Sequence, residues 1–254
     1  MPVVLVERQS PQVTIVTLNR PERRNALTID LMTELVAAIE LAAANEKQRI
    51  LILRGAGPVF CAGLDLQETA LTAHAHTAAE TVAKTLITLS QTRLITIAAV
   101  HGAAVAGGAG IMSACDFVLA AARTKFGYPE AKRGLVAGLV MTFLRRQLRE
   151  RDIRELLLTS ELIGATRARE IGLINRIVPP NELENETQKI VAAILQNAPG
   201  ALTNTKRLIE ELWCSSVKED VERALRHHMQ ARESDEAREG ISAFLEKRPP
   251  NWTL

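Results

Sequence analysis

The sequence HGAAVAGGAGIMSACDFVLAAARTKFGYPE, residues 101–130, is the most informative stretch of this chain. An apolar strand is predicted just before it, at 95–100, and a further strand within it, at 117–121. A helix is predicted between them, beginning at Gly107. Strand, helix and strand at this spacing indicate a crossover unit, and therefore an α/β fold with parallel strands.

The same stretch holds two features that could carry chemistry. Gly107 and Gly108 lie at the predicted helix start, where backbone N–H groups can bind an anion. Glu130 follows a proline and could move a proton. Each feature alone has an ordinary explanation, because small residues often serve close packing and most glutamates are solvated. Together they would suit an enzyme that stabilises an enolate.

On either side of this stretch, the sequence predicts α/β structure in the N-terminal part and helices towards the C-terminus. Apolar patterns predict strands at 3–8, 14–19 and 50–54, and a helix at 29–44 with Thr28 as its N-cap. Residues 67–90 lead into a further helix. Beyond about 151 we predict helices at 153–158, 167–171, 182–196, 202–212, 217–229 and 237–246, with a single strand at 175–178. We therefore expect a core domain at 1–198 and a helical region at 199–254, with a hinge near 179–180 or Pro199.

Composition excludes several classes of protein. The chain has 254 residues, 47% of them hydrophobic, and a net charge of +2, which gives no reason to expect nucleic-acid binding. Charged residues interrupt every apolar run, so no membrane span is predicted. The N-terminus shows no signal-peptide pattern, and we expect a cytoplasmic protein. Cys61, Cys115 and Cys214 form neither a metal pattern nor a disulfide framework.

Several catalytic motifs are missing from the sequence. The run Gly107–Gly110 lacks the spacing of a dinucleotide fingerprint, and no Gly-Lys-Ser/Thr follows it as in a P-loop. No Gly-x-Ser-x-Gly elbow supports a serine hydrolase. His74 and His76 lack further metal ligands, and His101 is interpreted as structural. No metal site is therefore predicted.

The motifs in their order along the chain are far more specific than any one of them. The sequence closely resembles the crotonase, or enoyl-CoA hydratase/isomerase, superfamily over nearly its whole length. The matching segments are TLNRPE (17–22), RNAL (24–27), FCAGLDL (60–66), IAAVHG (97–102), CD (115–116), FGYPE (126–130), GLIN (172–175) and AFLEKR (243–248).

This resemblance implies a fold, a substrate class and a set of site residues. It implies a spiral of ββα units, with a helical C-terminal region that forms trimers or dimers of trimers. It implies an acyl-CoA thioester as substrate and no cofactor, since coenzyme A is part of that substrate. The N–H groups of Leu64 and Gly107 would form an oxyanion hole, and Glu130 would be the acid/base.

The resemblance also implies residues that bind the substrate. Arg24 matches a position near the CoA phosphates, and Lys247 or Arg248 could contribute from a neighbouring subunit, although all three could equally be solvated surface charges. The span 66–85 would form a variable pocket wall. The remaining substrate-binding candidates are Ala62, Asp65, Gly108 and Gly110.

One departure from the family pattern decides how far the function can be named. Typical hydratases carry a second glutamate at the position that is Gly110 here. Hydration of a 2-enoyl-CoA through Glu130 is the leading hypothesis, because a branched or glutaconyl-type substrate, or another side chain, could position the water. The alternatives are Δ3,Δ2-enoyl-CoA isomerisation by Glu130 alone and a catalytically silent acyl-CoA-binding protein. The dehalogenase branch of the family uses an aspartate nucleophile, and the segment 134–140 contains no aspartate, so dehalogenation is not expected.

Overall fold

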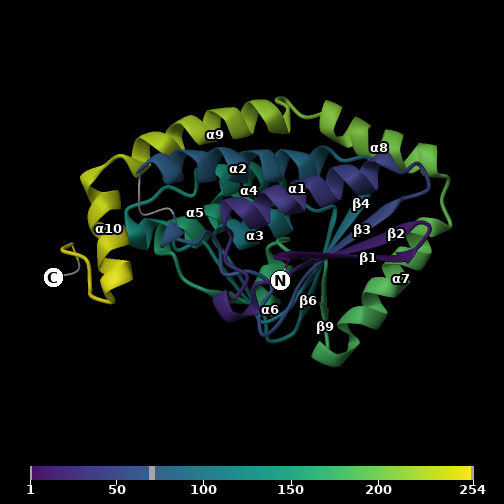
Figure 1. Cartoon of the computed structure of the whole chain (residues 1–254), viewed down its shortest axis with the longest axis horizontal. Helices are drawn as coiled ribbons and strands as arrows, with labels where there is room; N and C mark the ends of the chain where they lie inside the picture. The colour runs from purple at the N-terminus through teal and green to yellow at the C-terminus, as the bar shows by residue number, and fades with distance from the viewer. Residues whose placement is uncertain (1, 69–71, 253–254) are drawn as a thin grey trace.

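A six-stranded sheet forms the centre of the molecule, with helices on both of its faces (Figure 1). The computed structural model describes residues 2–68 and 72–252. The first strand runs antiparallel to the second, and the other neighbours are parallel. In spatial order the strands are β1 (Val4–Ser10), β2 (Val13–Leu18), β3 (Ile50–Gly55), β4 (Ile95–Val100), β6 (Phe117–Ala121) and β9 (Arg176–Val178).

Alternate residues of the parallel strands enter two different cores. Leu51 and Leu53 of β3 pack in the larger core, to which α1 (Ile29–Ala44) and α2 (Thr72–Gln91) contribute. Ile50 and Ile52 pack on the opposite face, against α7 (Leu183–Leu195). Successive side chains of a strand point to opposite faces, so a wholly apolar strand fits between two helical layers.

A second sheet of three strands lies next to the first and receives the chain after β4 and β6. It consists of β5 (Ala103–Val105), β7 (Lys125–Gly127) and β8 (Ile163–Gly164). β4 and β6 are thus each followed along the chain by a short strand of the other sheet, β4 by β5 and β6 by β7. The expectation of a single strand beyond 151 was wrong, because β8 also lies there. Two residues are too few to show alternation, and β8 is defined by its pairing with β7.

The described helices lie close to the predicted ones, and the helix at 29–44 agrees with the prediction at both ends. Thr28 caps it as expected, since its hydroxyl accepts a hydrogen bond from the Leu31 N–H. The prediction omitted α4 (Gly138–Gln147), which packs against α3. The remaining elements of this part are α3 (Gly107–Ser113), α5 (Glu150–Thr159), α6 (Ala165–Glu170) and the 3-10 turns η1 (Pro21–Arg23), η3 (Ala131–Arg133) and η4 (Pro180–Glu182).

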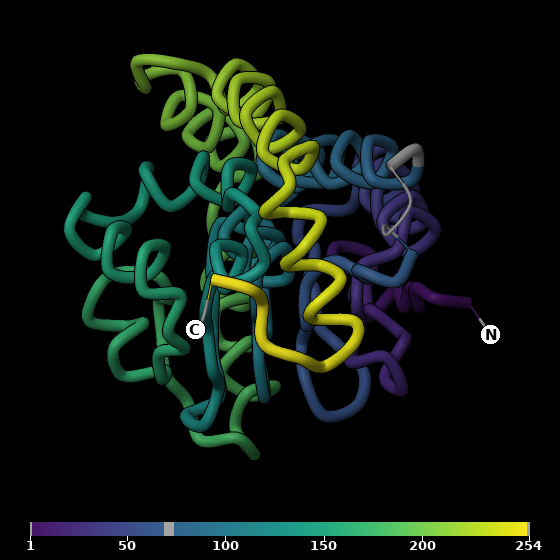
Figure 2. Tube along the Cα trace, turned by 90° about the vertical axis from the view of Figure 1, so that its left-hand side faces the viewer, coloured from purple at the N-terminus to yellow at the C-terminus, as the bar shows by residue number. Residues whose placement is uncertain are grey.

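The C-terminal helices fold back over their own chain. They are α8 (Pro199–Glu211), α9 (Val217–Arg232) and α10 (Asp235–Glu246). In Figure 1, α9 lies along α2, and it also packs against α4. Figure 2 shows α10 crossing the front of the core, where it contacts η3. Within residues 2–68 and 72–252, no helix has the length and hydropathy needed to cross a bilayer.

Candidate active site

The loop around Leu64 presents a backbone N–H that its neighbours leave unused. The Leu27 N–H donates to the Gly63 carbonyl at 2.8 Å, and the Asp65 N–H donates to the Leu27 carbonyl at 2.9 Å. In such a parallel bridge the N–H of the intervening residue, Leu64, faces away from the partner strand. It has no acceptor among the residues that the structure describes. Gly63 makes this turn with φ of +94°, which favours glycine.

The first turn of α3 brings a second such N–H to the same place. The first N–H groups of a helix have no intrahelical acceptor, and Gly107 is the first residue of α3. A Cβ built on Gly107 would lie 3.8 Å from the Leu64 nitrogen, so the two residues are neighbours. The preceding Ala106 has φ 50° and ψ −126°, an uncommon conformation for a residue other than glycine. This local strain accompanies the turn that exposes the Gly107 N–H.

Glu130 provides a buried carboxyl group. It follows Pro129, and its carbonyl accepts hydrogen bonds from the N–H groups of Arg133 and Leu135. Its Oε2 is buried and has no hydrogen-bond partner within the described part of the chain. Burial raises the pKa of Glu130 to about 7, outweighing its own backbone hydrogen bond and the positive charge of Arg133. A carboxyl with this pKa exchanges protons readily near neutral pH.

One pocket, with about 120 Å³ of space, contains these groups. Leu64, Gly107 and Glu130 all line it, and most of the remaining wall is apolar. It therefore combines two backbone donors and one carboxyl in a largely apolar setting, which strengthens electrostatic interactions. The other lining residues are Ala62, Leu66, Ala79, Val82, Val105, Ala106, Arg133, Leu135, Val136, Ala137, Gly138, Leu139, Val140, His228, Arg232 and Phe244.

Comparison with known proteins identifies the family of this chain. The family model described as enoyl-CoA hydratase/isomerase matches residues 8–254. The chain belongs to this family. It is 35% identical to an enoyl-CoA hydratase of Mycobacterium tuberculosis (99% of this chain, 96% of the other) and 30% identical to a crotonyl-CoA hydratase of Syntrophomonas wolfei (98% and 97%). A crystal structure of an enoyl-CoA hydratase from Mycobacterium avium superposes with a TM-score of 0.88 at 33% identity, covering 100% of both chains.

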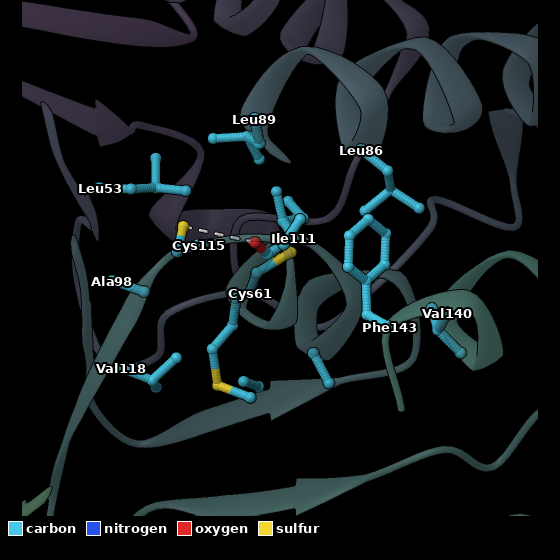
Figure 3. Packing of buried hydrophobic residues seen from close by; sticks show 14 of the residues in the cluster. Leu53, Cys61, Leu86, Leu89, Ala98, Ile111, Cys115, Val118, Val140 and Phe143 are labelled. Carbon is cyan, nitrogen blue, oxygen red and sulfur yellow. Dashed lines mark hydrogen bonds between the residues drawn. The ribbon is translucent and has the colours of Figure 1, made fainter. Parts of the chain in front are cut away.

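An apolar wall stands beside Gly110, the position at which the resemblance to typical hydratases predicts a second glutamate. Gly110 is buried in α3, and a Cβ built on it would lie 2.5 Å from Val140 Cγ1 and 3.8 Å from Leu86 Cδ2. Figure 3 shows Leu86, Phe143 and Val140 packed together in this region. There is consequently no room for a carboxylate at position 110 unless Val140 moves.

We expect Gly110→Ala to destabilise the protein by about 1–3 kcal/mol, because overpacking against a stiff β-branched side chain outweighs the better helix propensity of alanine. Denaturant unfolding should show that Gly110→Ala/Val140→Ala is less destabilised than the sum of the two single variants. Strict additivity would contradict the proposed contact between positions 110 and 140.

The other predicted site residues differ in their placement. Ala62 lines the pocket, whereas Asp65 is outside its lining and is buried, paired with Arg20 and Arg23 at 3.3 and 3.7 Å. Arg24 is exposed, and its carbonyl accepts the Ala62 N–H. Gly108 packs on Cys61, where a Cβ would lie 2.5 Å from the Cys61 carbonyl oxygen.

The predicted CoA contacts near the C-terminus lie outside the lining of this pocket. Lys247 is exposed at the end of α10. Arg248 forms ion pairs with Glu239 and Glu246. Of the predicted pocket wall at 66–85, Leu66, Ala79 and Val82 line the pocket, and residues 69–71 lie outside the described residues.

Sequence reasoning missed Asn25 as a residue that positions the site. Asn25 is fully buried, with φ of 54°. Its Nδ2 donates to the carbonyls of Ala56, Val59 and Phe60, and its Oδ1 accepts the Arg20 N–H. It thereby joins two loops that support Leu64. The sequence RNAL carried the signal, since asparagine is enriched at positive φ.

The pocket residues contributed by the C-terminal helices were also missed. Arg133 lies over the ring of Phe244, 4.4 Å from its centroid, and donates to the Pro129 carbonyl. His228 and Arg232 reach the pocket from α9. No local pattern could place these residues beside Glu130, because the tertiary fold of α9 and α10 brings them there.

Proposed function

We propose that this chain adds water to a 2-enoyl-CoA thioester. The observation that carries the proposal is the position of Glu130, a buried carboxyl with a pKa of about 7, in one pocket with the unused N–H groups of Leu64 and Gly107. Family membership supports an acyl-CoA substrate, and relatives of the chain are named as hydratases.

The proposed reaction uses Glu130 twice. The thioester oxygen accepts hydrogen bonds from the Leu64 and Gly107 N–H groups, which stabilise negative charge as the enolate forms. The Glu130 carboxylate takes a proton from water while the water oxygen bonds to C3 and the double-bond electrons move towards the thioester. Glu130 then returns this proton to C2, so that one water is added in total.

The family also suggests how the substrate and subunits are arranged. We propose that Arg24 contacts the CoA phosphates and that Lys247 of a neighbouring subunit can add a further positive charge. This requires the trimeric, or hexameric, assembly that the family resemblance implies. The same proposal assigns residues 199–254 to the assembly region and residues 1–198 to the core domain.

One observation favours a second candidate, the Δ3,Δ2-enoyl-CoA isomerase reaction. The wall of Val140 and Leu86 beside Gly110 offers no polar group to hold water. Isomerisation needs no water, because Glu130 can take a proton from C2 of the 3-enoyl thioester and return it to C4. The same carboxyl and oxyanion hole would serve both reactions.

Purified protein should be offered crotonyl-CoA, a 3-enoyl-CoA and 3-methylglutaconyl-CoA in parallel, and the products identified by liquid chromatography, which separates double-bond isomers of equal mass, coupled to mass spectrometry. The proposal expects a mass gain of one water on at least one 2-enoyl thioester. Turnover of the 3-enoyl substrate without any hydration would establish the isomerase instead. Binding of all three without turnover would indicate a silent acyl-CoA-binding protein.

The pH dependence of hydration should follow the Glu130 carboxyl. The first step needs the carboxylate, and burial raises the pKa of Glu130 to about 7. We therefore expect kcat/KM for hydration to fall about tenfold per pH unit below this pKa and to level off above it. Initial rates between pH 5 and 8.5 will check this, and a profile without a transition near neutral pH would contradict the assignment.

A further inference from the structure

Helix α9 brings a histidine into the pocket that holds Glu130. His228 and Arg232 are one helical turn apart, so they share a face of α9, and both line the pocket. The helix sits close to the start of α4. A Cβ on Gly138 would lie 2.9 Å from the Ala224 carbonyl oxygen and 3.7 Å from the His228 Cβ. The position of His228 is therefore set by close packing of backbone on backbone.

The contacts of His228 fix which ring nitrogen carries the proton. Nδ1 lies 3.1 Å from the Val136 carbonyl oxygen, which can only accept, so Nδ1 is the donor. Burial, the largest effect, lowers the pKa of His228, and together with the positive charge of Arg232 it outweighs the hydrogen bond to Val136, which raises the pKa. The ring is thus neutral near pH 7. Its Nε2 carries a lone pair and has no hydrogen-bond partner in 2–68 and 72–252.

The pocket needs such an acceptor if it hydrates its substrate. An attacking water has two hydrogens, and Glu130 can accept one of them. The position usual for a second carboxylate is closed by Val140. The other ionisable groups that line the pocket, Arg133 and Arg232, are guanidinium groups, which donate hydrogen bonds and do not accept them. Nε2 of His228 is therefore the lining side-chain atom, besides the Glu130 carboxylate, that can accept from water.

We propose that His228 holds the attacking water, accepting through Nε2 the hydrogen that Glu130 does not take. This rests on the proposed hydration function and extends it. His228 stays neutral throughout: the water proton that is transferred goes to Glu130 and then to C2, and the hydrogen bonded to His228 remains on the product hydroxyl. Enolate formation itself needs Glu130 and the two backbone donors, but not His228.

Two reactions of the same enzyme distinguish enolate formation, which needs Glu130 and the two backbone donors, from binding of the attacking water by His228. Exchange of the C2 protons of butyryl-CoA in D₂O reports enolate formation without any attacking water, and hydration of crotonyl-CoA reports both. The variants are His228→Phe, which keeps the ring shape, and His228→Gln, which restores an acceptor. The control is His227→Phe, since His227 is exposed on the same helix and lines a different hollow.

We expect His228→Phe to lower kcat for hydration on the order of 10²-fold, with KM within about threefold and C2 exchange nearly unchanged. His228→Gln should recover part of the hydration rate, and His227→Phe should alter neither reaction. Unchanged hydration in both His228 variants would overturn the inference, as would an equal loss of hydration and exchange in both. Absence of both reactions in the wild-type enzyme would instead overturn the proposed function.

Discussion

Glu130→Gln is expected to lower kcat for crotonyl-CoA hydration by roughly 10³-fold, because the amide neither takes the proton from water nor returns one to C2. KM should change little, since the thioester still binds the Leu64 and Gly107 N–H groups. Steady-state kinetics will check this, with the exposed Glu22→Gln as the control for loss of a carboxylate elsewhere. A Glu130→Gln variant with a kcat within tenfold of the wild-type value would remove Glu130 from the mechanism.

The same substitution should stabilise the fold at alkaline pH. Burial raises the folded-state pKa of Glu130 from 4.5 to about 7, so the folded protein favours the protonated carboxyl. The stabilisation from this proton is complete below pH 4.5 and is lost as pH rises through 7. At pH 8 glutamine removes the cost of a buried carboxylate, and the free energy of unfolding should rise by about 2–3 kcal/mol. If Glu130→Gln is inactive and has a lower free energy of unfolding than the wild type at pH 8, the proposed cost of burying the Glu130 carboxylate is contradicted.

Leu64→Pro is expected to lower kcat/KM by about 10²–10³-fold by deleting one oxyanion donor. The neighbouring hydrogen bonds use the Gly63 carbonyl and the Asp65 N–H, so they do not need the Leu64 N–H. Proline is tolerated where the N–H does not belong to a ladder, and the preceding glycine has no Cβ to clash with the ring.

The matched control for Leu64→Pro is Leu64→Ala, which shortens the side chain but keeps the N–H. Thermal melts of both variants will show whether the loop remains folded. If Leu64→Ala loses as much activity as Leu64→Pro in equally stable proteins, the side chain matters and the N–H does not.

The long elements of this fold could be predicted from the sequence because their apolar patterns are strong. Strand 95–100 and helix 29–44 are bounded by turns or a cap, and both agree with the structure. The short strands β5, β7 and β8 could not be found in this way. Two or three residues show no periodicity, and their pairing comes from segments far apart in the sequence.

Some residues of the candidate site could likewise be predicted from the sequence, and others could not. The family resemblance implies roles for Leu64, Gly107 and Glu130, and these three residues do line one pocket. The closure of position 110 by Val140 and the entry of His228 were not predictable, because they depend on how α4 and α9 pack. The absence of a second glutamate was visible in the sequence, whereas what occupies its place is a property of the tertiary structure.

The role of Glu130 and the two backbone donors in enolate formation is tested by the rate of deuterium incorporation at C2 of butyryl-CoA in D₂O, measured by mass spectrometry for the wild-type protein and Glu130→Gln. This reaction needs a base and an oxyanion hole and does not depend on the choice between hydration and isomerisation. The proposed site predicts steady incorporation by the wild-type protein and a loss of roughly 10³-fold in the variant. Equal incorporation by both proteins, or none by the wild type, would contradict it.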